Sequence, residues 1–292
     1  MALAVAALAS AACLGRSGGE SAGSTADGGE AERLYEEGLS WARKAEAAPL
    51  PTPDPAAGGA APEFKPEELR ALESFEKALA AQPDHAASHL ALADLLAPHA
   101  LARAERERAV RAAQEAAAQR RPRRGRPPPP TPPPVATPVS LVDASVDRVI
   151  GAYRAALQAD PSRAPVDRLI AFAARAGRLD VAEDGHQELL RRVRESAEPY
   201  ALYGDFLVAH RADRERAIEQ YRQALIWKPD DEAVRAKLAD IHLARGIEYY
   251  GKQEFARAAV EFKEASKYVS DRDSERGRRL QTYLQRMREI RR

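Results

Sequence analysis

The stretch AIEQYRQALIWKPDD, residues 217–231, decides the fold of this 292-residue chain. Pro229 cannot continue the interior of a helix, and it pushes Lys228 out of the α region. Asp230 and Asp231 are favourable N-cap residues for a following helix. The stretch therefore predicts a helix with one buried stripe, a stop, and the start of a second helix. The stripe at i, i+1, i+4, i+7 and i+8 consists of Ala217, Ile218, Tyr221, Ala224 and Leu225.

Similar phrases occur three more times, as ALESFEKALAAQPDH at 71–85, VIGAYRAALQADPSR at 149–163 and AAVEFKEASKYVSDR at 258–272. Upstream of the opening stretch, PYALYGDFLVAH at 199–210 predicts another helix with Gly204 in its middle. Glycine costs about 1 kcal/mol relative to alanine inside a helix, so we expect a neighbouring helix to pack closely there. The two helices together form a unit of 34 residues, 198–231.

This unit resembles the tetratricopeptide repeat (TPR), a helix–turn–helix of 34 residues. In that family helix A carries an aromatic residue, Leu and Gly, and helix B carries Ala, an aromatic residue, Ala and a following Pro. The loop between the helices is one residue longer here than is usual in the family. The matching positions are Tyr200, Tyr203, Gly204 and Leu207 in helix A, and Ala217, Tyr221, Ala224 and Pro229 in helix B.

Four further copies are placed on the same anchors. The first carries Leu34, Gly38, Trp41, Ala71, Phe75, Ala78 and Pro83; the second carries His89, Leu92, Ala93, Leu96, Val149, Tyr153, Ala156 and Pro161. The third is degenerate, with Leu169, Ala171, Ala182, His186 and Leu189. The fifth carries Gly246, Tyr249, Ala258, Phe262 and Ala265; its glycine falls seven residues late, which predicts a longer helix A over 232–250.

The resemblance implies an all-α, right-handed superhelical solenoid of about five repeats over residues 30–270. Residues 271–292 are expected to hold a C-terminal capping helix over 274–290, with inward-facing Leu280, Tyr283, Leu284 and Met287. A generic helical bundle is the alternative.

Two insertions, 46–66 and 98–142, split the first two copies and are rich in proline, which predicts disorder. The start of the second, 98–120, could extend as an Ala/Arg helix. We favour a solvated low-complexity insert there; a polyproline ligand and an anion-binding Arg cluster are the alternatives.

Composition limits the partners. The net charge of +1 steers neither nucleic acid nor acidic substrates, and no nucleic acid is expected. The one cysteine, Cys13, allows neither an intramolecular disulfide nor a cysteine-based zinc site.

The N-terminal segment 1–29 consists of a short apolar run, Cys13 and a Gly/Ser-rich tether. ASAAC at 9–13 resembles the lipobox of bacterial lipoproteins, which implies cleavage before Cys13 and attachment of lipid there. Ser10 stands where that family usually has Leu, and no Lys or Arg precedes the apolar run. The resemblance predicts lipid anchoring in a bacterial cell envelope. The alternative is an Ala-rich leader on a soluble cytoplasmic adaptor.

No catalytic motif is present, so neither an enzyme nor a cofactor is predicted. His85 and His89 lie four residues apart, but zinc would need further ligands, and we expect packing roles for both. TPR arrays bind peptides or partner proteins in a concave groove lined by their A helices, so the resemblance implies a non-catalytic scaffold. The groove lacks the Lys, Asn and Arg set of the family's carboxylate clamp, and we expect an extended peptide with an acidic and an aromatic residue. The predicted groove residues are Asp94, Arg168, Phe172, Arg175, Asp205, Ile247 and Tyr250.

Overall fold

The computed structural model describes residues 25–49, 63–119, 142–271 and 274–290 of the chain. All regular structure in these ranges is helical, and none of their helices is long and apolar enough to cross a membrane. The helices are α1 (Thr25–Ala47), α2 (Pro66–Ala81), α3 (Ala86–Gln119), α4 (Val146–Ala159), α5 (Ala164–Ala176), α6 (Leu179–Arg192), α7 (Ala197–Phe206), the π-helical turn η2 (Leu207–Arg211), α8 (Arg214–Trp227), α9 (Glu232–Gly251), α10 (Phe255–Tyr268) and α11 (Glu275–Ile290).

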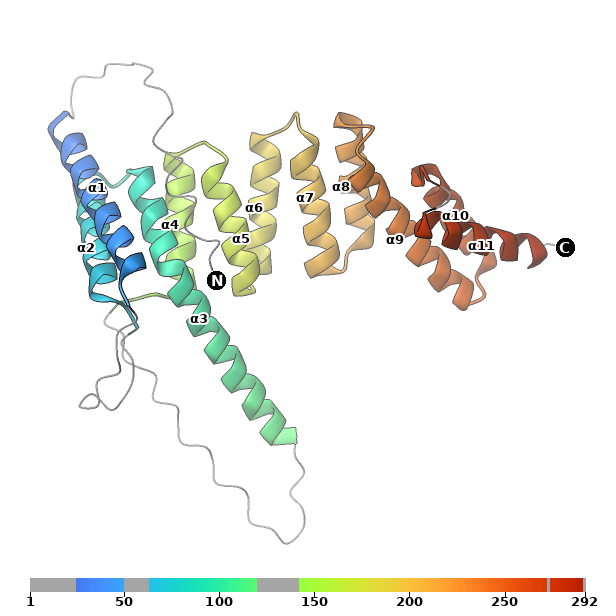
Figure 1. Cartoon of the computed structure of the whole chain (residues 1–292), viewed down its shortest axis with the longest axis horizontal. Coiled ribbons are helices and arrows are strands. Elements are labelled where there is room, and N and C mark those ends of the chain that lie inside the picture. Colours follow the sequence, from blue (N-terminus) through green and yellow to red (C-terminus); the bar gives the residue numbers. More distant parts are fainter. Residues whose placement is uncertain (1–24, 50–62, 120–141, 272–273, 291–292) are drawn as a thin grey trace, which may run out of the picture.

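Consecutive helices pair as antiparallel hairpins, and five such hairpins lie side by side in chain order (Figure 1). We call the first helix of each hairpin helix A (α1, α3, α5, α7, α9) and the second helix B (α2, α4, α6, α8, α10). Each helix A from α3 onward also packs on the helix B that precedes it. The fold is therefore an all-α solenoid, as the repeated phrase predicts.

Proline and aspartate set the boundary between the fourth and fifth hairpins as predicted. α8 ends at Trp227, two residues before Pro229. Asp231 is the N-cap of α9, and its side chain accepts hydrogen bonds from the backbone N–H groups of Ala233 and Val234. The carboxylate thereby satisfies two of the four free N–H groups at the start of α9.

The helix A glycines permit close contact with an aromatic ring of helix B. A Cβ atom added at Gly204 would lie 2.6 Å from a ring carbon of Tyr221. Gly38 and Gly246 approach Phe75 and Phe262 in the same way, with a Cβ at 2.5 Å from the ring. The prediction of close packing at Gly204 is confirmed. The third repeat reverses the arrangement, because there the small residue lies on helix B: a Cβ at Gly185 would lie 2.6 Å from Ile170.

Both insertions are more ordered than predicted. α3 continues through Pro98 to Gln119, so the Ala/Arg helix considered for 98–120 is present over 98–119, and this part is not disordered. Ala, Glu and Arg dominate this segment and have high helix propensity, which outweighs a single proline near the fourth turn. The Pro-rich remainder, 120–141, lies outside the described residues, as does 50–62.

The two ends of the first insertion either belong to helices or form hydrogen bonds with them. Glu46 and Ala47 belong to α1, and Pro66 starts α2. Between them, the Lys65 ammonium donates to the carbonyls of Ala45 (2.6 Å) and Ala48 (2.8 Å), and so caps α1. At the N-terminus, 25–29 is helical rather than part of a tether, and residues 1–24 lie outside the described chain.

The hydrophobic core has two parts that meet within α9. The larger runs from α1 to the first half of α9, where Val234, Leu238 and Ile241 belong to it. The smaller joins the second half of α9 to α10 and α11, and it contains Leu280 with Tyr283, Leu284 and Met287 packed against it. These four residues are the ones predicted to face inward. The predicted length of α9 is confirmed, and Figure 1 shows α9 running obliquely to α8.

Candidate functional site

Asp94 and Asp205, two of the predicted groove residues, lie in equivalent three-residue clusters. In each, the aspartate follows the small residue of helix A, accepts a hydrogen bond from a tyrosine of its own helix B, and binds a cation of the next helix A. The first cluster is Tyr153–Asp94–Arg168, in which the Tyr153 hydroxyl lies 2.8 Å from Asp94 and Arg168 forms an ion pair with the same carboxylate. We call it the closed cluster, because the Asp94 and Arg168 side chains are each only 24% exposed.

The second cluster is Tyr221–Asp205–Lys237, which we call the open cluster. The Tyr221 hydroxyl donates to Asp205 Oδ1 at 2.7 Å, and Lys237 Nζ donates to Oδ2 at 2.7 Å. Here the Asp205 side chain is 43% exposed and the Lys237 side chain 40%. Burial raises the pKa of both tyrosines, and the hydrogen bond to Asp205 raises the pKa of Tyr221 further. Both hydroxyls therefore remain protonated donors at neutral pH.

Other repeats contain phenylalanine where these two have tyrosine, and there the aspartate is absent. Phe75 and Phe262 have no hydroxyl, and the residue after the helix A glycine is Leu39 or Ile247. The aspartate thus accompanies a hydroxyl that needs an acceptor, since a buried hydroxyl without one is costly. This correlation between helix A and helix B was visible in the sequence and was missed.

Phe172 and Arg175 do not belong to a common site with Arg168. Phe172 is only 4% exposed and packs beside Tyr153, with ring centroids 5.8 Å apart. The prediction that it faces a groove is wrong, because the repeat pattern of α5 begins one residue earlier than Pro161 suggests. Ile170, not Ala171, occupies the position facing helix B. Arg175 is exposed near the end of α5, and its carbonyl accepts a hydrogen bond from Arg108 at 3.4 Å.

Ile247 and Tyr250 are half-buried in the smaller core rather than freely available. The ring of Tyr250 meets Tyr283 of α11 edge-on, with centroids 5.5 Å apart. The capping helix therefore packs against this end of the helix A face. The accessible part of the predicted site is centred on α7, where the open cluster lies.

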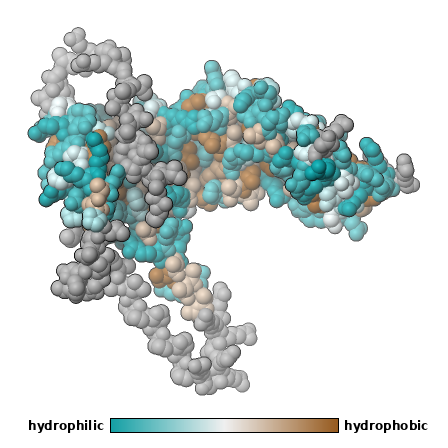
Figure 2. Space-filling view, viewed as in Figure 1, coloured by the Kyte–Doolittle hydropathy of each residue, from teal (hydrophilic) through white to brown (hydrophobic). Residues whose placement is uncertain are grey.

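The helix A face of α7 and of the following η2 turn also carries exposed apolar side chains that were not predicted. Leu202 is 37% exposed and Val208 is 40% exposed, and each lies three residues from Asp205. Residues at this spacing lie on one side of a helix. Figure 2 shows apolar surface gathered over the middle of the array, in the region of α5 to α8.

The π-helical turn η2 accounts for the extra residue noticed between Gly204 and Ala217. A π turn accommodates one inserted residue within a helix, and such turns are frequent at functional sites. Ala212 then adopts a left-handed conformation (φ 53°), and the Asp213 N–H donates to the Leu207 carbonyl at 3.2 Å. The insertion is thus absorbed in η2, directly after α7, and Val208 lies within this turn.

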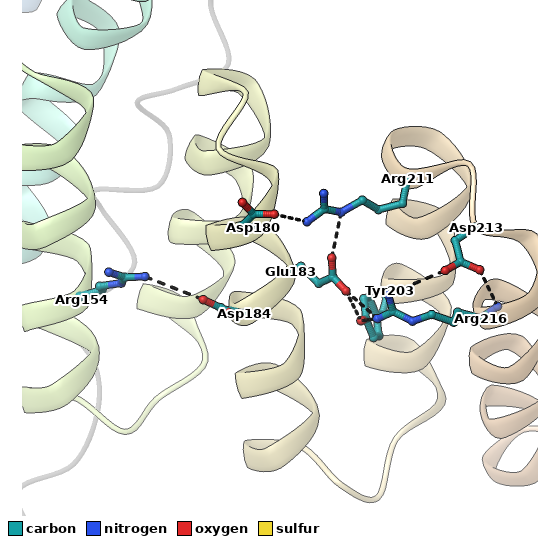
Figure 3. Close-up of polar contacts among 8 residues, drawn as sticks. All are labelled: Arg154, Asp180, Glu183, Asp184, Tyr203, Arg211, Asp213 and Arg216. Atoms are coloured by element: carbon teal, nitrogen blue, oxygen red, sulfur yellow. Dashed lines mark hydrogen bonds and ion pairs between the residues drawn. The ribbon is translucent and has the colours of Figure 1, made fainter.

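A polar network that links α6 to η2 and α8 holds this turn in place (Figure 3). Glu183 of α6 accepts hydrogen bonds from Arg211 (2.9 Å), Arg216 (2.6 Å) and the Tyr203 hydroxyl (3.1 Å). Burial opposes ionisation of Glu183, but the hydrogen bonds from Arg216 and Tyr203 outweigh it and lower its pKa. Arg211 also binds Asp180 at 2.5 Å. Arg211 and Arg216, the two arginines near η2, therefore both form ion pairs with carboxylates.

The histidines noted in the sequence have separate structural contacts. His85 Nδ1 lies 2.7 Å from the Ser88 hydroxyl, whereas His89 Nε2 lies 2.8 Å from the Pro83 carbonyl oxygen. In the described ranges, no three His, Cys, Asp or Glu side chains are grouped to hold a metal ion. A cavity of about 340 Å³ lies between α9 and α11, but two of its lining residues, Asp240 and Arg276, are already joined by hydrogen bonds.

Comparison with known proteins finds solved structures of low sequence identity. No family model and no curated protein sequence matches the chain. The MamA protein is 14% identical over 82% of this chain and 92% of its own, with a TM-score of 0.41. The pilF protein of Pseudomonas aeruginosa is 13% identical over 89% and 93%, with a TM-score of 0.37. YrrB, described as a TPR protein with an unusual peptide-binding site, is 13% identical over 89% and 100%, with a TM-score of 0.36. These similarities concern the fold, and no partner or location follows from them for this chain.

Proposed function

We propose that this chain is a non-catalytic scaffold that binds a peptide segment of a partner protein on its helix A face, at α7. The observation that carries the proposal is the coincidence of exposed Leu202 and Val208 with the half-open Asp205–Lys237 pair. Binding sites for peptides combine apolar contact area with a few oriented polar groups, and this surface offers both. A rigid array of packed helices also holds such a surface in one shape without a ligand.

The structure changes the ligand expected from the sequence. The sequence predicts an extended peptide with an acidic and an aromatic residue, and the acidic residue would need a free cation to bind. Arg168 is instead neutralised by Asp94, so reversing its charge would disrupt the closed cluster rather than test binding. Substitutions at α7 therefore test binding more directly than substitutions at Arg168.

Site-specific photo-crosslinking in cells that produce the full-length chain tests the proposal. A benzophenone amino acid at Val208 should yield a crosslinked partner. The matched control carries the same group at Glu219, an exposed position of α8 away from the helix A face. A crosslink from Val208 and none from Glu219 supports binding at α7. No crosslink from Val208, or equal yields from both positions, would contradict it.

Lipid attachment at Cys13 in a bacterial cell envelope is the second part of the proposal. It rests on the ASAAC sequence alone, since Cys13 lies outside the described residues. Mass spectrometry of the mature N-terminus should find a lipid-modified cysteine, and Cys13→Ala should move the protein from the membrane to the soluble fraction. An unprocessed N-terminus with a free thiol would instead support the cytoplasmic adaptor.

A further inference from the structure

We infer that the open cluster selects a neutral peptide segment, holding one amide group against Asp205 and Lys237 and resting apolar side chains on Leu202 and Val208. This inference rests on the proposed function, because it specifies the chemistry of the segment that binds at α7. It differs from the acidic ligand that the sequence alone suggested.

The first argument is the number of unused hydrogen-bonding positions. A carboxylate has about four acceptor positions and an ammonium group has three donors. Asp205 uses one position for Tyr221 and one for Lys237, and Lys237 shows one such bond, to Asp205. A free acceptor and a free donor therefore lie side by side on an exposed surface. An amide group, with one N–H and one C=O, is their complement.

The second argument is charge. The Asp205–Lys237 pair is neutral as a unit. A ligand carboxylate drawn to Lys237 would be repelled by Asp205, and a ligand ammonium drawn to Asp205 would be repelled by Lys237. Three arginines of the same two hairpins are already bound to carboxylates: Arg211 and Arg216 bind Glu183, and Arg245 lies between Glu215 and Glu261. A neutral segment avoids like-charge repulsion and gives up no strongly hydrated ion.

The third argument is the contrast with the closed cluster. The residues three before and three after Asp94 are Ala91, which is buried, and Ala97, which is half-buried. The same positions around Asp205 are Leu202 and Val208, both exposed. Apolar area and accessible polar groups therefore coincide at one cluster and not at the other. Burial of the two side chains would supply most of the affinity, while the amide contacts would fix orientation.

Synthetic peptide pools offered to the full-length chain test this inference. Three pools of 15-residue peptides share apolar positions and differ only in their polar residues, which are Asn and Gln, Asp and Glu, or Lys and Arg. The Asn/Gln pool should bind most tightly, and its affinity should change less than about twofold between 50 and 500 mM salt, since screening acts on net charges. Tighter, salt-sensitive binding of either charged pool would overturn the inference.

Matched variants locate the binding. Lys237→Met should weaken the Asn/Gln pool about fivefold, the loss expected for one net hydrogen bond. Arg168→Met, in the closed cluster, should leave that affinity unchanged. Equal effects of the two variants would contradict recognition by the open cluster. A charged pool that binds best, together with crosslinking from Val208, removes the neutral-ligand inference and leaves the proposed function intact. Absence of both binding and crosslinking removes the proposed function itself.

Discussion

The closed and open clusters both combine a tyrosine hydroxyl, an aspartate and a cation, but only the open cluster leaves a surface for a partner. In both, a helix B tyrosine and a cation of the following helix A hold the aspartate of helix A. In the closed cluster, alanines flank Asp94 along its helix and Arg168 covers part of its carboxylate. The open cluster lies beside the π-helical turn, with Leu202 and Val208 exposed around it.

The same arrangement of tyrosine, aspartate and cation therefore serves two purposes in the array. It satisfies a buried tyrosine hydroxyl and ties consecutive repeats together in both places. At α7 an inserted residue and two larger apolar side chains add accessible area to it. The same bonds that fix the repeat geometry then hold a binding surface in shape. Variants can test whether the structural role and the binding role are separate in the two clusters.

Lowering the pH should have the largest effect, and it acts on the repeat between the two clusters. His186 occupies the helix B position that Tyr153 and Tyr221 occupy in their repeats, and it is only 5% exposed. Burial lowers its pKa to about 4, whereas an unfolded histidine titrates near 6.5. The unfolded state therefore binds the proton first, and stability should fall as the pH drops from about 6.5 to 4, by about 3 kcal/mol at most.

The measurement is urea denaturation of the native chain and of His186→Leu at pH 7 and pH 4. Because other groups also titrate in this range, the informative quantity is the difference between the two proteins. The leucine variant should lose less stability between the two pH values. Parallel losses would show that His186 does not set the acid sensitivity of this repeat.

Gly204→Ala should have the next largest effect. The added Cβ would lie 2.6 Å from the Tyr221 ring, so the ring must move and its hydroxyl must leave Asp205. Overpacking of this kind costs about 1–3 kcal/mol. The reciprocal control is Ala93→Gly in the closed cluster, which introduces no clash and should cost about 1 kcal/mol through helix propensity. Denaturation curves that rank the control as the more damaging change would contradict this view of the close contact.

Residues whose roles follow from local periodicity could be predicted from the sequence. Pro229, Asp231 and Gly204 act as expected, because each role depends on the residue's own backbone or on one neighbouring helix. Phe172 was misplaced, because the third repeat lacks the helix A glycine and moves its small residue to Gly185 on the other helix. Without that anchor, the one-residue shift of α5 was not detectable by spacing alone.

The candidate site was only half predictable for a different reason. Asp94, Arg168 and Asp205 were identified, but their partners were not, since the pairing depends on how consecutive repeats pack. Lys237 lies in the next repeat, 32 residues from Asp205 along the chain. The exposure of Val208 accompanies a π turn whose only sequence trace was one extra residue. The correlation of tyrosine with aspartate was the signal that could have identified both clusters.

Removal of the tyrosine hydroxyl should lower the free energy of unfolding by different amounts in the two clusters, and both losses should be smaller than that from Gly204→Ala. Tyr153→Phe leaves a mostly covered Asp94 with one acceptor position empty, and we expect a loss of about 1.5 kcal/mol. Tyr221→Phe should cost about 0.5 kcal/mol, because water reaches the more exposed Asp205 and replaces the hydroxyl. Urea denaturation of both variants measures the two losses. Equal losses would mean that the difference in exposure has no energetic consequence.

The smallest expected effect concerns the two ion pairs, and it probes the open cluster most directly. Arg168→Met should cost about 1 kcal/mol, because Arg168 and Asp94 are largely covered and screened little by salt. Lys237→Met should cost only a few tenths of a kcal/mol, since an exposed pair in water is weak and costs side-chain entropy to form. A double-mutant cycle of Lys237→Met and Asp205→Asn at 50 and 500 mM salt measures the coupling energy between Lys237 and Asp205. A coupling energy that is small and disappears in salt means that Asp205 does not fix Lys237 in place, so Lys237 can turn a donor to a ligand amide at little cost. A large, salt-insensitive coupling would make Lys237 a structural residue like Arg168, and the open cluster would then lose its free donor.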